Sequence, residues 1–381
     1  MKFDREKYLK DLEELVNTDS GSFYPEGLET VADILVKKYK DAGFYTFLGH
    51  SGENNRPYVA AYTKKEEETG GQEKPIDIML FGHFDTVFSD GTAAERPFTV
   101  DEEKAYGPGV ADMKSGVLLG LYLADALKKK HPGISIGILN NGDEEIGSID
   151  SHHVLLDFAG KSKYAFDMEP GRISGNFVKC RKGGGEYMVK CYGVSAHAGN
   201  APQKGASAIC EAARCVEELH ALNDYEGGTT VNVGIIKGGS ASNSVPDYCE
   251  MIVDVRYWTD EQRVAVEEKI WNIGKKVRNK STRVDVHRMS SAPPMLEIPQ
   301  TQKMVDVMEE EARKLSLSFG FEKSGGMSDA SFVSEAGVPV IDACGPCGDF
   351  LHSEKEYIVL DTIEERFYLL FNTIERLLGY Q

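Results

Sequence analysis

Five short segments of this 381-residue chain carry an imidazole or a carboxylate in loops where predicted strands end. The side chains in them that could do chemistry are His83, Asp85, Asp112, Glu144, Glu145, Glu169 and His352. In α/β proteins the loops that follow the strands converge at one edge of the sheet, and ligands bind there. We therefore expect these side chains to meet in one site.

The residue types in this cluster point to metal chemistry. Burying so many acids together is prohibitive without a cation, and two divalent ions would neutralise three carboxylates whereas one would not. Mixed imidazole and carboxylate ligands favour zinc or a similar first-row metal over calcium or magnesium, which prefer oxygen ligands. Taken singly, each position has an ordinary alternative, a histidine bonded to backbone or a solvated acid. The prediction depends on their joint occurrence.

The elements that must position these residues alternate between helices and strands. Apolar residues at helical spacing predict helices at 8–16, 28–36, 113–130 and 148–159, and apolar runs predict strands at 57–63, 76–82, 134–140 and 164–169. This alternation predicts a sheet sandwiched between helices. The charged segment 64–74 is predicted to be a solvated loop.

A different pattern begins at Gly183. The predicted order is strand 186–193, helix 205–222, strands 230–237 and 249–257, helix 260–278 and strand 282–289. This β-α-β-β-α-β order predicts a ferredoxin-like antiparallel sheet with two helices on one face. A helix at 301–315, a strand at 338–342 and a helix from about 361 then resume the first pattern. We predict one α/β domain formed by 1–182 and 296–381, with an α+β domain, 183–295, inserted in it.

Composition excludes several classes of protein. Lys and Arg total 43 against 61 Asp and Glu, and a formal charge of −18 disfavours nucleic acids and anionic membranes as partners. We expect no secretory signal at the N-terminus, and the longest apolar stretch, 117–127, is far shorter than the roughly 20 residues that a bilayer requires. Seven irregularly spaced cysteines fit a reducing compartment, so we expect a cytoplasmic protein.

Several longer motifs occur together and in a fixed order. They are GHFDTV, FTVDEEKAYGPGVADMKSG, NGDEEIGS, the EP of FDMEP, SAHAGNAPQKGASA, GGSASNSVPD with DVRY, GGMSDASF and LHSEKEYI. Over nearly its whole length the chain resembles the M20 family of co-catalytic zinc metallopeptidases, and within it the glutamate carboxypeptidase (carboxypeptidase G2-like) branch. The resemblance implies a zinc-peptidase-like catalytic domain, three-layered with a mixed sheet, and an inserted domain that serves as lid and dimerisation surface.

The resemblance also implies roles for the clustered residues. Asp112 would bridge two Zn²⁺ ions per subunit, with Co²⁺ or Mn²⁺ as possible substitutes. The remaining metal ligands would be His83 and Glu169 at one ion, and Glu145 and His352 at the other. Asp85 would hold the imidazole of His83 in its metal-binding tautomer, and Glu144 would be the general base.

Further roles fall on the inserted domain and its surroundings. His197 would reach a neighbouring subunit's active site and stabilise the oxyanion, which implies a homodimer; the alternative is a turn histidine. Asn243, Arg256 and Gly326 would contact the substrate, and Arg256 could grip a carboxylate bidentately. The alternatives are a surface ion pair for Arg256 and an ordinary turn at Gly326, next to Gly325.

Two positions depart from the pattern of the branch. Ala292 precedes Pro293 where several carboxypeptidases have an arginine, so we expect one additional contact to a glutamate side chain to be missing. Met113 follows Asp112 where some relatives have a second acid. On family grounds we expect a cis peptide bond between Asp112 and Met113.

The resulting hypothesis is a dizinc hydrolase that removes a C-terminal amino acid, with glutamate as the expected residue, from a small peptide or N-acyl amino acid. An M20-type aminotripeptidase, aminoacylase or related amidohydrolase is the alternative within the same chemistry. A binding protein that has lost turnover, and a thiol oxidoreductase using Cys344 and Cys347, are alternatives from other classes; the loop context of the C-x-x-C motif disfavours the second.

Overall fold

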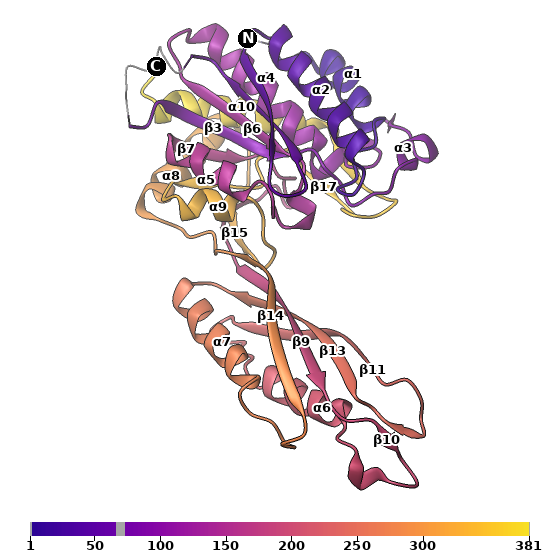
Figure 1. The fold of residues 1–381 in the computed structure, drawn as a ribbon. Coiled ribbons are helices and arrows are strands. Elements are labelled where there is room, and N and C mark those ends of the chain that lie inside the picture. The colour runs from indigo at the N-terminus through magenta and orange to yellow at the C-terminus, as the bar shows by residue number, and fades with distance from the viewer. Residues whose placement is uncertain (1, 66–72, 381) are drawn as a thin grey trace. The chain divides into compact units, whose positions relative to one another are not determined.

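The computed structural model describes residues 2–65 and 73–380 (Figure 1). It forms two compact units, one made of Met1–Cys180, Glu297–Lys323 and Ser328–Gln381, the other of Arg181–Leu296 and Ser324–Met327. The segment Ser324–Met327 joins the second unit because its backbone pairs with the start of that unit: the Lys182 N–H donates to the Ser324 carbonyl at 3.0 Å. Most of the charged segment 64–74, residues 66–72, lies outside the described residues.

The first unit is built on a six-stranded mixed sheet with the order β1-β2-β6-β3-β7-β16. The strands are β1 (Tyr45–Ser51), β2 (Arg56–Tyr62), β3 (Ile76–His83), β6 (Ile136–Asn141), β7 (Ser162–Asp167) and β16 (Val340–Ile341). Strands β6, β3, β7 and β16 run parallel, whereas β1 and β2 pair antiparallel at one edge. The parallel strands therefore end at the same edge of the sheet.

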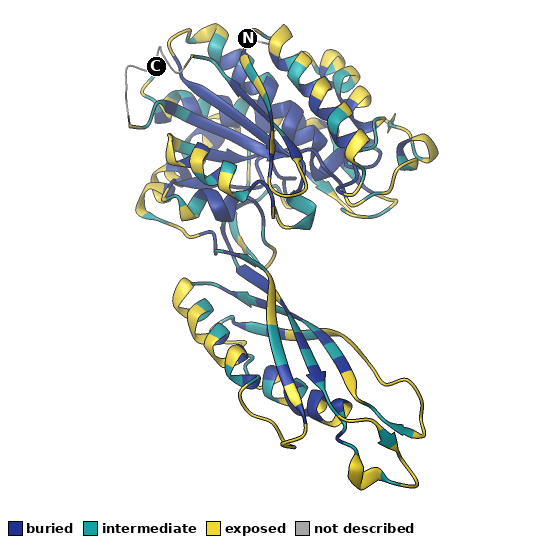
Figure 2. Cartoon of the chain, in the orientation of Figure 1, coloured by how far each residue is buried: buried dark blue, intermediate teal, exposed yellow. Residues whose placement is uncertain are grey.

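Helices cover both faces of this sheet. The main helices are α1 (Arg5–Val16), α2 (Pro25–Asp41), α4 (Ser115–Lys130), α5 (His152–Gly160), α8 (Pro299–Leu315) and α10 (Leu360–Leu377), with the short α9 (Ala330–Glu335). Ile78 and Leu80 belong to the same apolar cluster as α1, α2, α4, α8 and α10. On the other face α5 packs so closely that a Cβ at Gly137 would lie 2.7 Å from the ring of Phe158. With both faces covered, β3 is almost entirely buried, as Figure 2 shows.

Short elements complete the first unit. They are α3 (Thr92–Glu95), β4 (Thr99–Val100), β5 (Lys104–Tyr106), the π-helical turn η2 (Val110–Lys114), the 3₁₀ turn η3 (Glu144–Ile146), β8 (Phe177–Arg181), β15 (Phe321–Ser324), β17 (Gly348–Asp349) and β18 (Tyr357–Val359). A small antiparallel sheet, β17-β18-β5-β4, brings the segment before α10 next to the segment before η2. The two turns η2 and η3 carry acids of the predicted site.

The second unit is a four-stranded antiparallel sheet, β11-β13-β9-β14, with two helices. Its elements are β9 (Gly183–Tyr192), β10 (Ala196–His197), η4 (Pro202–Lys204), α6 (Ala208–His220), β11 (Thr230–Gly238), β12 (Ser244–Val245), β13 (Tyr248–Tyr257), α7 (Asp260–Ile273) and β14 (Arg283–Ala292). Alternate residues of β13 are buried, which is the pattern of a sheet with one covered face. The predicted fold class, a mixed-sheet α/β unit with a ferredoxin-like insertion, is confirmed.

Some element boundaries differ from the sequence-based expectation. Helix α6 begins at Ala208 rather than at 205 because the side chain of Ser207 caps it, accepting from the Cys210 N–H at 3.1 Å. Helix α7 ends at Ile273, before Gly274, and not at 278. Among the residues described, no helix combines the length and the apolarity needed to span a bilayer.

Candidate metal centre

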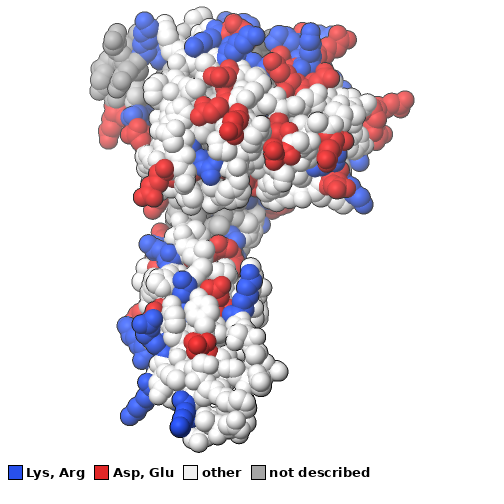
Figure 3. All heavy atoms as spheres, turned by 45° about the vertical axis from the view of Figure 1, so that its right-hand side comes forward, with Lys and Arg blue, Asp and Glu red and all other residues white. Residues whose placement is uncertain are grey.

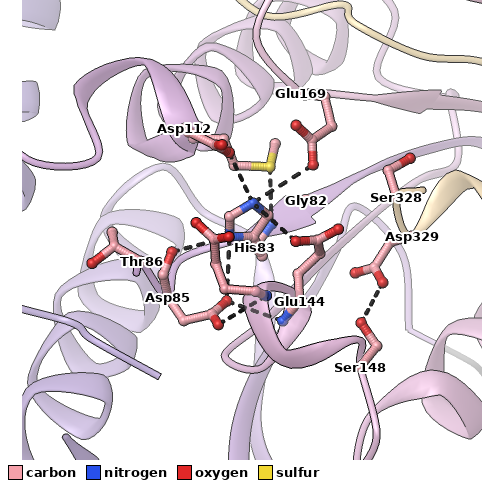
Figure 4. A network of polar contacts seen from close by, with 12 residues as sticks. Gly82, His83, Asp85, Thr86, Asp112, Glu144, Ser148, Glu169, Ser328 and Asp329 are labelled. Atoms are coloured by element: carbon pink, nitrogen blue, oxygen red, sulfur yellow. Dashed lines mark hydrogen bonds and ion pairs between the residues drawn. The ribbon is translucent and has the colours of Figure 1, made fainter. Parts of the chain in front are cut away.

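The strand ends of the first unit bring the predicted acids and imidazoles together. Figure 4 shows part of this set, with His83 at the centre of Asp85, Asp112, Glu144 and Glu169. His83 is the last residue of β3, and Glu169 follows the end of β7 by two residues. Glu144 and Glu145 form the turn η3 after β6. Asp112 lies in η2, directly before α4, and His352 follows β17 in the chain.

Two trios of ligand-type side chains share Asp112. In the first, the Nε2 atom of His83 lies 3.2 Å from Oδ1 of Asp112 and 3.6 Å from Oε1 of Glu169. In the second, Nε2 of His352 lies 3.1 Å from Oδ2 of Asp112 and 3.2 Å from Oε2 of Glu145. The two oxygens of the Asp112 carboxylate thus face different trios, which is the arrangement that a bridging ligand requires.

Asp85 connects the first trio to the η3 turn. Its carbonyl oxygen and its Oδ1 lie 3.0 and 3.2 Å from Nδ1 of His83, so the ring carries its proton there and directs Nε2 toward Asp112 and Glu169. The same carboxylate accepts from the backbone N–H groups of Glu144 and Glu145, at 3.1 and 3.2 Å, and from the hydroxyl of Ser22 at 2.7 Å. One fully buried carboxylate therefore orients an imidazole and anchors the turn with both glutamates.

Glu144 stands apart from both trios. Its Oε2 atom lies 3.8 Å from Nε2 of His83, beyond hydrogen-bond distance. Burial raises the pKa of Glu144 well above its ordinary value, and the charges of Glu169, Asp329 and Glu145 add to the effect, although His83 opposes it. The result is a carboxyl group with a high proton affinity beside the trios.

The electrostatics of the trios favour added positive charge. Burial lowers the pKa of His83, but hydrogen bonds to Asp112 and Asp85 outweigh it and hold that pKa well above its usual value. Hydrogen bonds to Asp112 and Glu145 raise the pKa of His352 to about 10. In the absence of any other cation, the imidazoles are thus drawn toward their charged forms by the surrounding carboxylates.

A metal cation among these residues would bind a carboxylate oxygen that the imidazoles leave without a donor. Oε1 of Glu145 is buried and has no hydrogen-bond partner among the described residues. A buried carboxylate oxygen without a donor is costly, and a metal ion would satisfy it. The mixture of imidazole nitrogens and carboxylate oxygens is the ligand set of first-row divalent metals.

The predicted cis peptide bond between Asp112 and Met113 is confirmed. The Met113 sulfur accepts from the backbone N–H of His83 at 3.2 Å. The side chain of Met113 is thus packed against the end of β3.

Several residues that support the site were not predicted from the sequence. Glu356 accepts three backbone N–H groups of the segment 109–112, and burial raises its pKa to about 7. Asp329 is buried, accepts from the side chains of Asn141 and Ser148, and so ties α9 to the loop that follows η3. Both acids occur inside motifs singled out in the sequence, but only their burial distinguishes them from neighbouring acids.

The second unit holds the predicted His197 and Asn243 in one place. Strand β10 pairs with β12, and the Ala198 N–H donates to the Asn243 carbonyl at 2.9 Å. The exposed ring of His197 accepts from the Gly199 and Asn200 N–H groups through Nδ1, at 3.1 and 3.0 Å. Its remaining nitrogen, Nε2, is therefore the protonated one and is a hydrogen-bond donor.

Arg256, Gly326 and Ala292 also lie in the second unit. The guanidinium of Arg256 makes a forked ion pair with Asp254, at 2.6 to 3.0 Å, which corresponds to the surface ion pair considered as the alternative. The backbone of Gly326 is exposed, and a Cβ there would meet its nearest neighbour only at 3.8 Å. The buried Ala292 is held by its carbonyl, which accepts from the Tyr257 hydroxyl.

Cys344 and Cys347 are both buried and both free thiols. The Cys344 thiol donates to the Ile341 carbonyl, and burial raises its pKa well above the usual value. The Cys347 sulfur accepts from Arg366. Because a reactive thiol needs exposure and a low pKa, these contacts disfavour redox chemistry at the pair.

A cavity of about 240 Å³ opens beside Glu145. Its other walls are the segments 21–24 and 86–90 together with Ile146, and among the described residues no lysine, arginine or histidine lines it. Phe23 and Val87 on its walls are strongly exposed. A cavity of about 150 Å³ is sufficient to hold benzene, so this one has room for a side chain.

Comparison with known proteins adds a family context to this geometry. Residues 79–376 match the model of Peptidase family M20/M25/M40. Carboxypeptidase G2 of Pseudomonas sp. (strain RS-16) is 30% identical over 373 residues, which cover 95% of this chain and 87% of that protein. A tripeptidase structure from Staphylococcus aureus aligns with a TM-score of 0.78 and 22% identity over 98% of both chains. A dinuclear metal-binding peptidase from Bacillus subtilis aligns with a TM-score of 0.71 and 15% identity over 99% of both chains.

Proposed function

This chain belongs to peptidase family M20/M25/M40, and on that premise we propose that it releases a C-terminal amino acid, with glutamate as the expected residue, from a small peptide or N-acyl amino acid. The observation that carries the proposal is the position of Asp112, which both trios share: one carboxylate oxygen lies beside His83 and the other beside His352. A single carboxylate shared in this way is what a two-metal hydrolase needs.

The residues that would hold the metals are the two trios. His83, Asp112 and Glu169 would bind one ion, and Asp112, Glu145 and His352 the other. We assign zinc, with Co²⁺ or Mn²⁺ as substitutes, because imidazole and carboxylate ligands occur together. When bound, such ions polarise a carbonyl oxygen and acidify water at neutral pH.

Glu144 is the proposed general base. It is the carboxylate beside the trios that belongs to neither, so both its oxygens are available for proton transfer. Burial and neighbouring acids raise its pKa, which suits a group that takes a proton from water and passes it to the departing amine. Asp85 fixes its backbone and therefore its distance from His83.

His197 is the proposed donor to the oxyanion, acting across a homodimer. With Nδ1 occupied by two backbone N–H groups, Nε2 offers its proton outward. Strand β11 lies at an edge of its sheet and exposes Ile235 and Ile236, each about half accessible, which supports pairing of two copies through the inserted unit. We propose that His197 of the partner subunit completes each site.

Substrate recognition is assigned to both units. Arg256 would have to exchange Asp254 for the substrate carboxylate, with Asn243 and Gly326 as further contacts. The cavity beside Glu145 has no cationic side chain among the residues described in its walls and would take an uncharged acyl group. The face of the molecule in Figure 3 mixes acidic and basic side chains. We propose a cytoplasmic enzyme without nucleic-acid or membrane partners, in line with the net charge of −18.

Hydrolysis of a panel of blocked dipeptides tests the proposal. The purified protein, loaded with zinc, should release glutamate from N-acyl-glutamate faster than alanine from N-acyl-alanine, and a chelator should abolish both reactions. Persistence of hydrolysis in a metal-free preparation, or in Glu144→Ala, contradicts the assigned chemistry.

An aminotripeptidase or aminoacylase is the second candidate, favoured by the structural likeness to the tripeptidase from Staphylococcus aureus. Tripeptides with a free amine, presented beside the same peptides with a blocked amine, separate the two functions. Cleavage of only the free-amine peptides replaces the carboxypeptidase assignment. A protein that binds zinc and hydrolyses neither series is a binding protein that has lost turnover.

A further inference from the structure

Glu356 is a buried acid that the proposed mechanism does not use. It lies four residues after His352, directly before β18, and only 2% of its surface is exposed. Its Oε1 accepts from the backbone N–H groups of Ala111 and Asp112, at 2.8 and 3.0 Å. Its Oε2 accepts from the Gly109 N–H at 3.1 Å. Both oxygens therefore bind the backbone of one loop, the loop that carries Asp112.

Backbone hydrogen bonds within that loop bind only some of its N–H groups: those of Val110 and Lys114 donate to the carbonyls of Gly107 and Gly109. Gly109 has a φ of 71°, and Asp112 and Met113 have non-helical dihedral angles inside η2. A Cβ at Gly109 would lie 2.6 Å from Thr86, so the chain passes close to the loop that follows His83. The N–H groups of Gly109, Ala111 and Asp112 need acceptors from elsewhere, and the two oxygens of Glu356 accept from all three.

The position of this loop determines whether the two oxygens of Asp112 can reach His83 and His352 at the same time. Oδ1 of Asp112 lies 3.2 Å from His83 and Oδ2 lies 3.1 Å from His352. A small displacement or rotation of the loop would move one oxygen away from its trio. Glu356 and His352 belong to the same short segment, so the acceptor of the loop and a residue of the second trio lie four residues apart in the chain.

We propose that Glu356 is the positioning residue of the bridging carboxylate: its two oxygens fix the backbone of Asp112 so that both metals are held at once. The inference rests on the proposed two-metal function and adds a residue that neither the motif pattern nor the ligand set identifies. It predicts that loss of Glu356 weakens the binding of both metals. Loss of a ligand that belongs to one trio only, such as Glu169, would instead weaken first the binding of the metal in that trio.

The chemistry of the three contacts makes Glu356→Gln the informative variant. An amide keeps one acceptor oxygen for Ala111 and Asp112, but its NH₂ group would face the Gly109 N–H, donor against donor. Volume is almost unchanged. Glu354→Gln is the matched control, since Glu354 is an exposed acid of the same segment.

The test is zinc titration of the full-length, metal-free protein by calorimetry, together with the visible absorption spectrum of the Co²⁺-loaded protein. Glu356→Gln should weaken both zinc equivalents by about 10–100-fold and change the Co²⁺ spectrum, while Glu354→Gln should match the wild type in both. Unfolding of the metal-free variants by urea checks that each is folded.

If Glu356→Gln does not fold, Glu356→Asp serves instead, because it keeps the charge and shortens the reach by one methylene. A folded variant of either kind that binds two zinc ions with wild-type affinity, and gives the wild-type Co²⁺ spectrum, overturns the inference alone. Failure of the wild-type protein to bind two zinc ions overturns the proposed function, and the inference with it.

Discussion

Replacement of Asp85 by asparagine probes how the site is assembled, because this carboxylate touches three parts of it. It faces Nδ1 of His83, and it accepts from the backbone of Glu144 and Glu145. An asparagine can accept from one of the two backbone groups, but its NH₂ group faces the other. The substitution therefore disturbs the ligand atom of His83 and the turn that carries both glutamates.

The magnitude follows from the contacts. Hydrogen bonds to a charged acceptor contribute about 1.5–3 kcal/mol each; besides facing Nδ1 of His83, Asp85 accepts from the N–H groups of Glu144 and Glu145 and from the hydroxyl of Ser22. Repulsion between Asp85 and the neighbouring acids Asp143 and Glu145 offsets part of this. We expect Asp85→Asn to lower the free energy of unfolding of the metal-free protein by about 1–3 kcal/mol. Zinc affinity should fall by about 10–100-fold, which corresponds to about 1.4–2.8 kcal/mol.

Urea unfolding and zinc calorimetry on the same preparations measure the two effects. Asp90→Asn is the control, since Asp90 is an exposed acid five residues further along the chain. It should leave both the unfolding midpoint and the zinc affinity unchanged. Wild-type zinc affinity in a folded Asp85→Asn protein would refute the idea that Asp85 orients His83 for metal binding.

Three other substitutions separate the roles of base, donor and scaffold. Glu144→Gln should lower kcat by about 10²–10⁴-fold with zinc stoichiometry unchanged, and a loss of zinc would instead make Glu144 a ligand. His197→Ala should lower kcat by about 10²–10³-fold without moving the urea midpoint, because the ring is exposed; unchanged kcat removes it from the mechanism. In the second unit, burial opposes ionisation of Glu211, but Arg214 and backbone donors hold its pKa below the usual value of about 4.3. The ionised Glu211 therefore stabilises the fold above the usual pKa, and this stabilisation is lost as the pH falls through the lower pKa of the folded state. Glu211→Gln should lower the free energy of unfolding by about 3 kcal/mol at pH 7 and by less near pH 3. Unfolding can be followed by the fluorescence of the chain's two tryptophans, both of which lie in this unit. An equal loss of stability at both pH values contradicts the pKa shift.

The parts of the site that follow from the sequence are those that depend on strand ends. His83 and Glu169 lie at the ends of apolar runs that predict strands within a helix–strand alternation, so their meeting at one sheet edge was predictable. Glu356 was not, because its contacts depend on the direction of backbone N–H groups almost 250 residues away in the chain. Ser22, which donates to Asp85, carries no signal in its local sequence for the same reason.

The fold shows the same division between local pattern and long-range contact. The β-α-β-β-α-β order of the inserted unit was predictable from periodicity, since alternate residues of β13 face its helices. Strand β1 was missed because its first half is exposed or half-buried and lacks an apolar run; it is defined by its pairing with β2. Side-chain pairing is harder to predict: the sequence does not indicate which of the nearby acids pairs with Arg256, and the structure shows that it is Asp254.

The most direct test of the account is the number of zinc ions bound by the wild-type chain and by Asp112→Ala. Calorimetric titration of the metal-free proteins, checked by metal analysis after gel filtration, should give two equivalents for the wild type. Asp112→Ala should retain neither at wild-type affinity, because both trios contain this residue. One equivalent in the wild type, or two unaltered equivalents in Asp112→Ala, would contradict a bridged pair of metals.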